Sequence, residues 1–139
     1  MVKKFLFLKV FIFCIIFAFS CRECLAKIKS SSKHLYREAV YQHAWCSAHK
    51  GTEEYKNDDF TRVDCLTDTH AVEFDFARKW AESVGQAEYY AYKTGKKGMV
   101  VLILENPDKE KVYYERVKKL GKIHGFDTEY ITPKMLKMN

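Results

Sequence analysis

The sequence predicts an α/β domain with a central, mixed, four-stranded sheet that is flanked by helices in a three-layer-like arrangement. Two adjacent segments, Phe60–Leu66 and His70–Phe76, alternate apolar and polar residues as half-buried strands do. The continuous apolar run Met99–Leu104 is typical of a central strand that is covered on both faces. A helical pattern separates this run from the two earlier segments, and such a crossover joins parallel strands, so the sheet is expected to be mixed.

Length and composition fit one folded domain. The chain has 139 residues, of which 47% are hydrophobic and 30% charged, with 6 Gly and 2 Pro. These values exclude a disordered tail, a collagen-like fibre and a polytopic membrane protein. A chain of this length forms one domain rather than two.

Met1–Ala26 reads as a secretory signal peptide. Lysines at the start precede the apolar run Val10–Ser20, which is short for a bilayer span, and small residues precede a cleavage point after Ala26. Two alternatives are a lipoprotein acylated at Cys21 and a retained single-pass anchor. Residues 27–139 are expected to form a single exported domain that is periplasmic or secreted, with no membrane span once the signal is removed.

The net charge and the cysteine count change when the signal peptide is removed. The full chain carries a formal +6, whereas residues 27–139 hold 20 basic and 17 acidic side chains, a net +3. This mild basicity does not by itself indicate a nucleic-acid partner. Two cysteines remain, Cys46 and Cys65, and an oxidising compartment favours a disulfide between them. The alternative is two unpaired thiols.

The first half of the domain is expected to contain a helix and a hairpin. The helix covers His34–His43, with Ser32 as its N-cap. Residues 46–59 are polar and charged and are predicted to be a loop or a bent hairpin. Phe60–Leu66 and His70–Phe76 then form two antiparallel strands across a tight turn.

The second half is expected to alternate helices and strands. A helix covers Arg78–Thr94 and stops at Gly95, and the strand Met99–Leu104 follows. A second helix begins at Asn106-Pro107 and ends at Gly125, and Phe126–Ile131 forms a last short strand. The predicted order of elements is therefore α-β-β-α-β-α-β.

Three acidic residues converge in this layout. Asp64 lies near the end of one hairpin strand, and Glu73 lies on the next strand. Asp75 follows Glu73 at a spacing of two, so both side chains leave the same face of the sheet. One interpretation is a solvated strand face. The other is a site for Mg²⁺ or Mn²⁺, since clustered carboxylates need a cation between them to stay ionised.

The helix that follows this strand carries a polar stripe at helical spacing, formed by Lys79, Ser83, Gln86 and Tyr90. Because the helix begins just after Asp75, Lys79 is expected to reach back to the acidic cluster. Gln86 and Tyr90 would face whatever lies across the site. A solvated helix face is the alternative interpretation.

Together these features resemble the PD-(D/E)XK nuclease superfamily, restriction-endonuclease-like, in its RecB-type branch. The resemblance covers about residues 36–131. It rests on Glu38 in the first helix, on Asp64, on the strand residues 72–75, and on the Gln-x-x-x-Tyr motif that Gln86 and Tyr90 form. The predicted order of elements is also similar to that of the family.

The resemblance implies a role for each residue. Asp64 and Glu73 would be metal ligands, helped by the backbone carbonyl of Phe74, and Glu38 would be an additional acidic residue. Gln86 and Tyr90 would position the nucleic-acid backbone or the catalytic groups.

The sequence departs from the family pattern at one catalytic position. Asp75 stands where the strand lysine of the family belongs, and Lys79 from the next helix is the expected replacement.

The resemblance therefore predicts an exported, Mg²⁺- or Mn²⁺-dependent phosphodiesterase that acts on nucleic acid, with DNA favoured over RNA. Metal would polarise the scissile phosphate and activate a water. The alternative is a catalytically degenerate nuclease fold that serves as a binding or structural module in the periplasm. A third possibility is a small secreted structural protein without a site.

Overall fold

The computed structural model describes residues 34–136, so the predicted signal peptide and the predicted cap Ser32 lie outside the described residues. Three α-helices, five strands and two short 3-10 turns make up the described part of the chain. In chain order they are α2 (Glu38–Ala48), β1 (Thr52–Lys56), β2 (Arg62–Leu66), β3 (His70–Phe76), η1 (Ala77–Lys79), α3 (Trp80–Thr94), β4 (Lys97–Ile103), α4 (Pro107–His124), β5 (Asp127–Ile131) and η2 (Pro133–Met135).

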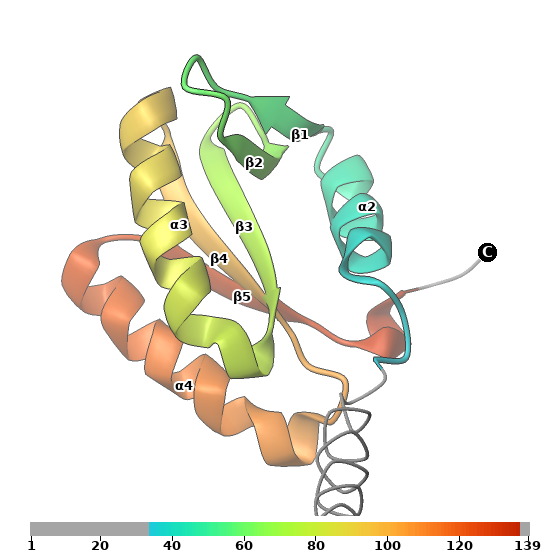
Figure 1. Ribbon diagram of the computed structural model, residues 1–139. Coiled ribbons are helices and arrows are strands. Elements are labelled where there is room, and N and C mark those ends of the chain that lie inside the picture. The colour runs from blue at the N-terminus through green and yellow to red at the C-terminus, as the bar shows by residue number, and fades with distance from the viewer. Residues whose placement is uncertain (1–33, 137–139) are drawn as a thin grey trace, which may run out of the picture. The chain divides into compact units, whose positions relative to one another are not determined.

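The strands form one mixed sheet in the order β1-β2-β3-β4-β5 (Figure 1). Strands β1, β2 and β3 are antiparallel neighbours, and β3, β4 and β5 run parallel. The mixed α/β architecture, the hairpin and the parallel crossover agree with the sequence prediction, but the expected four strands are five. The additional strand is β1, which lies within residues 46–59, a segment predicted to be a loop or a bent hairpin, and it forms an antiparallel hairpin with β2. All five of its residues are exposed, so it lacks the alternation that marks a half-buried strand.

The first helix begins and ends later than predicted. Helix α2 covers Glu38–Ala48 instead of His34–His43, and Arg37 is its N-cap residue. Tyr41 and Trp45 are buried one helical turn apart against the sheet, and this contact sets the extent of the helix. The predicted boundary depended on a serine cap that lies outside the described residues.

Helices cover both faces of the sheet (Figure 1). Helix α2 packs on one face, where Val72 and Phe74 of β3 join its core. Helices α3 and α4 pack on the other face, over Val100 and Leu102 of β4. Because side chains alternate along β3, Glu73 and Asp75 belong to the face that α3 covers.

A disulfide joins Cys46 of α2 to Cys65 of β2, the pair expected from the sequence. Gly51 lies against this bridge, and a Cβ atom at that position would be only 2.8 Å from Cys46 Sγ. Disulfides persist in oxidising compartments, so the bridge is consistent with one. Among residues 34–136, we find no helix with the length and apolar content that a membrane crossing requires.

Candidate functional site

The candidate site begins where β2 and β3 separate. Their ladder contains the pairs Cys65–Val72 and Leu66–Ala71. Asp64 is the next residue on β2, and its carboxylate bonds to β3 directly: the Phe74 backbone N–H donates to Asp64 Oδ2 at 2.8 Å. The side chain of Asp64 therefore occupies the gap that opens between the two strands.

A cavity of about 100 Å³ lies at this gap. It combines side chains from two strands, from α2 and from the start of α3. The lining residues are Glu38, Asp64, Glu73, Phe74, Asp75, Lys79, Glu82 and Gln86. Of the site residues expected from the sequence, only Tyr90 lies outside this lining. Since a water occupies about 30 Å³ in the liquid, the cavity has room for an ion with a few waters but not for a nucleobase.

The acidic side chains of β3 are buried, so the interpretation of a solvated strand face is wrong. Glu73 is 2% exposed and Asp75 is 4% exposed. Burial, followed by the nearby charge of Asp64, raises the pKa of Glu73 to about 10. Burial also raises the pKa of Asp64 to about 6, although the N–H of Phe74 acts in the opposite direction. The two carboxyl groups therefore favour a single shared charge near neutral pH, with the proton on Glu73.

One oxygen of this pair lacks a partner. Glu73 Oε2 is buried without a hydrogen bond from any described residue. An unsatisfied buried oxygen costs free energy, and a cation or an ordered water would remove that cost. The described residues contain no group of three or more His, Cys, Asp or Glu side chains arranged to hold a metal. Mg²⁺ in proteins keeps several waters and is bound through as few as one or two carboxylates.

Lys79 reaches the cavity from the side of Asp75. The turn η1 carries the chain from β3 into α3, and it leaves Lys79 Nζ at 3.7 Å from Asp75 Oδ1 and 3.8 Å from Glu82 Oε2. Within the described residues, Lys79 makes no ion pair with Asp64 or Glu73. Burial raises the pKa of Asp75 to about 6, and the charge of Lys79 opposes this shift.

Glu38, Gln86 and Tyr90 complete the surroundings of the carboxylate pair. Burial, followed by the charge of Asp64, raises the pKa of Glu38. Gln86 lines the cavity and hydrogen-bonds to Tyr90, which is buried one turn further along α3. Burial and the charge of Glu73 raise the pKa of the Tyr90 phenol.

Two residues beside the site were missed by sequence reasoning. Gln42 of α2 is 4% exposed, and its Nε2 donates to the Asp64 backbone oxygen at 2.6 Å and to Glu54 Oε1 at 3.1 Å. Glu54 lies opposite Asp64 on β1, has a left-handed φ of 52°, and is skipped by the β1–β2 ladder. No periodic pattern marks either residue, and Glu54 lies within residues 46–59, for which the sequence predicted a loop or a bent hairpin.

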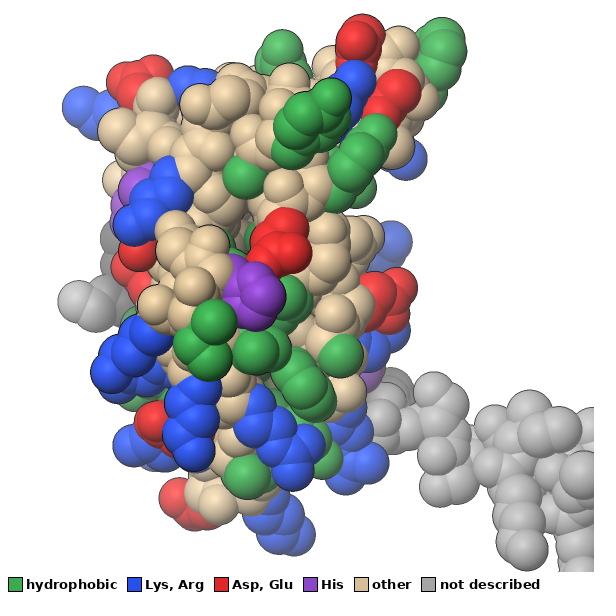
Figure 2. Space-filling view, turned by 90° about the vertical axis from the view of Figure 1, so that its left-hand side faces the viewer, with side chains coloured by type: hydrophobic (Ala, Val, Ile, Leu, Met, Phe, Trp, Pro, Cys, Tyr) green, Lys and Arg blue, Asp and Glu red, His purple; other side chains and the backbone are tan. Residues whose placement is uncertain are grey.

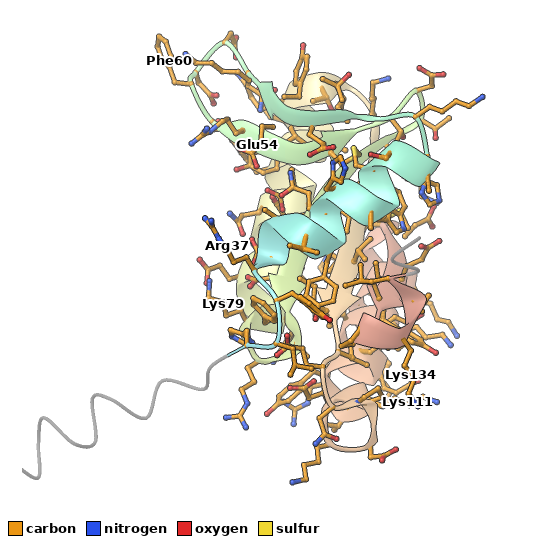
Figure 3. The ribbon with its side chains drawn as sticks, turned by 90° about the vertical axis from the view of Figure 1, so that its right-hand side faces the viewer. Arg37, Glu54, Phe60, Lys79, Lys111 and Lys134 are labelled. Atoms are coloured by element: carbon orange, nitrogen blue, oxygen red, sulfur yellow. A yellow bond between two sulfur atoms is a disulfide. The ribbon has the colours of Figure 1, made fainter. Side chains whose placement is uncertain are left out.

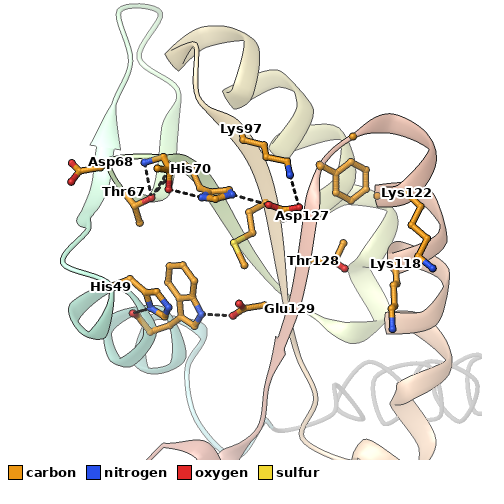
Figure 4. Close-up of a pocket in the computed structure, with 16 residues that line it drawn as sticks. His49, Thr67, Asp68, His70, Lys97, Lys118, Lys122, Asp127, Thr128 and Glu129 are labelled. Atoms are coloured by element: carbon orange, nitrogen blue, oxygen red, sulfur yellow. Dashed lines mark hydrogen bonds and ion pairs between the residues drawn. The ribbon is translucent and has the colours of Figure 1, made fainter.

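A larger cavity of about 700 Å³ lies elsewhere and shares no lining residue with the acidic one (Figure 4). Several of its polar groups are paired with one another. Asp127 accepts from Lys97 at 2.6 Å and contacts His70 Nε2 at 2.9 Å, and Glu129 accepts from the Trp45 indole N–H at 2.9 Å. The acidic cavity, which holds a buried oxygen without a partner, is therefore the stronger candidate for chemistry.

Comparisons of this chain with protein-family models, with curated proteins and with solved structures find no match.

Proposed function

We propose that this protein is a metal-dependent phosphodiesterase that hydrolyses nucleic acid outside the cytoplasm. One observation carries the proposal: the carboxyl groups of Asp64 and Glu73 line the same small cavity, and the buried Glu73 Oε2 has no partner among the described residues. Carboxylates that must share a proton when alone can both ionise beside a divalent cation.

In this proposal, Mg²⁺ or Mn²⁺ would be held by the side chains of Asp64 and Glu73 and by the carbonyl oxygen of Phe74. When bound, the metal would polarise the scissile phosphate and lower the pKa of an attacking water. The Phe74 N–H holds the Asp64 carboxylate in place from the other strand. The remaining volume of the cavity suits the waters that Mg²⁺ retains.

Lys79 is the proposed source of positive charge for the phosphate. It is exposed at the start of α3, and the buried Asp75 carboxylate holds its amine at the edge of the cavity. In this proposal Asp75, which stands where the resembled family has a lysine, has the role of orienting the exposed Lys79. Glu38, which lines the cavity from α2, is the proposed acceptor of a proton from the attacking water.

The disulfide and the expected signal peptide both favour action in an oxidising compartment. Gln86 and Tyr90, which hydrogen-bond to each other beside the acidic pair, are the proposed contacts to the substrate backbone. The alternative is a binding module without hydrolysis. The observation that favours it is the ion pair between Asp75 and Lys79, which occupies the lysine amine.

The test combines metal binding with hydrolysis. Mg²⁺ and Mn²⁺ are titrated by calorimetry into the purified protein and into Asp64→Ala and Glu73→Gln, with Glu115→Gln on the exposed face of α4 as the matched control. Cleavage of plasmid and single-stranded DNA is then followed with each metal. Saturable binding and cleavage that only the two cavity variants lose would support the proposal. Equal metal binding in every variant, or intact substrates with every metal, would contradict it.

A further inference from the structure

The turn between β1 and β2 contains an exposed aromatic residue in a strained conformation. The turn is closed by the Asn57 N–H donating to the Thr61 oxygen at 2.9 Å and by the Phe60 N–H donating to the Asn57 oxygen at 3.1 Å. Phe60 has a φ of 68°, in the left-handed region. Hairpin loops of this kind normally have glycine at the left-handed position, because a Cβ atom is unfavourable there. For a bulky residue, this conformation is an outlier.

Packing does not explain the aromatic side chain. Phe60 is 75% exposed, and Lys56 Nζ lies over its ring at 4.5 Å from the centroid. Glycine at this position would remove both the backbone strain and the exposed apolar surface. Strain of this kind persists in functional segments more often than elsewhere.

The hairpin tip is held in a fixed place. Asp59 accepts a hydrogen bond from the Tyr89 hydroxyl, and Lys93 pairs with Asp58, so two residues of the tip are tied to α3. Asp59 Oδ1 also accepts from the Thr61 backbone N–H at 3.1 Å. The Phe60 ring is therefore presented from an anchored loop.

The position of this ring relates it to the acidic cavity. Asp64 follows Phe60 by four residues, which corresponds to roughly 13 Å along an extended chain. In Figure 3, Phe60, Glu54, Arg37 and Lys79 follow one another down the same side of the molecule. Lys56 lies beside the ring, so cationic groups are present at both ends of this side.

We propose that Phe60 is a stacking platform for an unpaired base, and that the substrate of the acidic site is single-stranded nucleic acid. The inference rests on the proposed function and names its substrate class. An aromatic face with adjacent cations is how proteins hold single strands without reading their sequence. A base in a duplex is already stacked on both sides, whereas an unpaired base can lie on the free face of Phe60 while Lys56 contacts a phosphate.

The decisive variant is Phe60→Gly, which removes the ring and relieves the backbone. Binding is measured by fluorescence anisotropy in chelator, using a labelled 20-nucleotide single strand and the same sequence as a duplex. Cleavage of both substrates is measured separately with Mg²⁺. Phe60→Trp is the conservative variant. Tyr92→Ala is the control, because Tyr92 is an 82% exposed aromatic on α3 without left-handed backbone.

We expect Phe60→Gly to melt at a higher temperature while binding the single strand roughly tenfold more weakly. Phe60→Trp and Tyr92→Ala should retain affinity, and duplex binding should change little in all variants. If Phe60→Gly binds the single strand as tightly as wild type, or loses the same affinity for the duplex, then Phe60 is not a stacking platform for an unpaired base. If Phe60→Gly cleaves as well as wild type, this inference fails and the proposed hydrolysis stands. If the single strand binds through Phe60 but no metal supports cleavage, hydrolysis fails and the platform stands.

Discussion

The backbone N–H of Phe74 hydrogen-bonds to the side chain of Asp64 across two strands that are separating. A carboxylate thus takes the place of a main-chain acceptor at the point where the ladder ends. This bond holds the partly buried Asp64 beside the buried Glu73, the next side chain toward the start of β3, in one small cavity. Keeping two carboxyl groups this close costs free energy when both are ionised, and this cost underlies the predictions for stability and metal binding.

The first prediction concerns the pH dependence of the metal-free protein. The pKa of Glu73 is about 10 in the folded protein and near 4.5 in an unfolded chain, so the folded state retains a proton that the unfolded state releases. The free energy of unfolding should therefore fall as pH rises above about 4.5, and should keep falling until about pH 10. Asp64 and Asp75 add to this fall between about pH 4 and 6.

Glu73→Gln removes the titrating group and should flatten this pH dependence. In chelator at pH 8, we expect the variant to be more stable than wild type by on the order of 2 kcal/mol. Thermal melts from pH 5 to 9 measure the effect, with Glu115→Gln as the exposed control. A wild-type protein whose melting temperature rises steadily across this range would contradict the assignment.

The second prediction concerns Lys79 and hydrolysis. Lys79→Ala should lower the rate of metal-dependent cleavage by about a hundredfold, because it removes the positive charge proposed to act on the phosphate. The melting temperature should also fall somewhat, because the buried Asp75 carboxylate loses its ion-pair partner. Lys111→Ala, on the exposed face of α4, is the control for a general loss of positive charge. Figure 2 shows Lys and Arg side chains gathered over the lower half of the α3–α4 side. Equal rates in the two variants would remove Lys79 from the mechanism.

The third prediction concerns the disulfide. Replacing both Cys46 and Cys65 by alanine should lower the free energy of unfolding by about 3 kcal/mol, because the bridge closes a chain segment with a sequence separation of 19. Denaturant melts with and without a thiol reductant measure this loss. The reductant should destabilise wild type to a similar degree and leave the double variant unaffected. A reductant effect on the double variant would point to a different cause.

The fourth prediction concerns Gln42. Gln42→Leu keeps the approximate size of the side chain but removes the hydrogen bonds to the Asp64 carbonyl and to Glu54, so we expect a loss of about 1–2 kcal/mol. It should also weaken Mg²⁺ binding in calorimetry, because the backbone of Asp64 loses its hydrogen bond from α2, although the neighbouring disulfide still joins α2 to β2. The neighbouring variant His43→Gln, which alters only an exposed contact with Glu53, should do neither. Loss of stability with unchanged metal affinity would confine Gln42 to a structural role.

Much of the fold was predictable from local patterns. Alternation in His70–Phe76 and the apolar run of β4 were sufficient for the hairpin, the parallel crossover and the mixed sheet. Strand β1 was not predictable in this way, because an exposed edge strand is held by backbone hydrogen bonds that any sequence can make. For the same reason the position of Glu54, which is the side-chain partner of Gln42, could not be predicted from the sequence alone.

The spacing of residues along the chain determined by itself that Glu73 and Asp75 share one face of a strand, that Asp64 lies on its neighbour, and that Lys79 and Gln86 follow on one side of a helix. Only the tertiary structure decided that Glu73 and Asp75 are buried, that burial raises the pKa of Glu73 and that the amine of Lys79 is held by Asp75. The reason is physical: direction along a strand or helix depends on local backbone geometry, whereas burial and pKa depend on which other elements pack over the same residues.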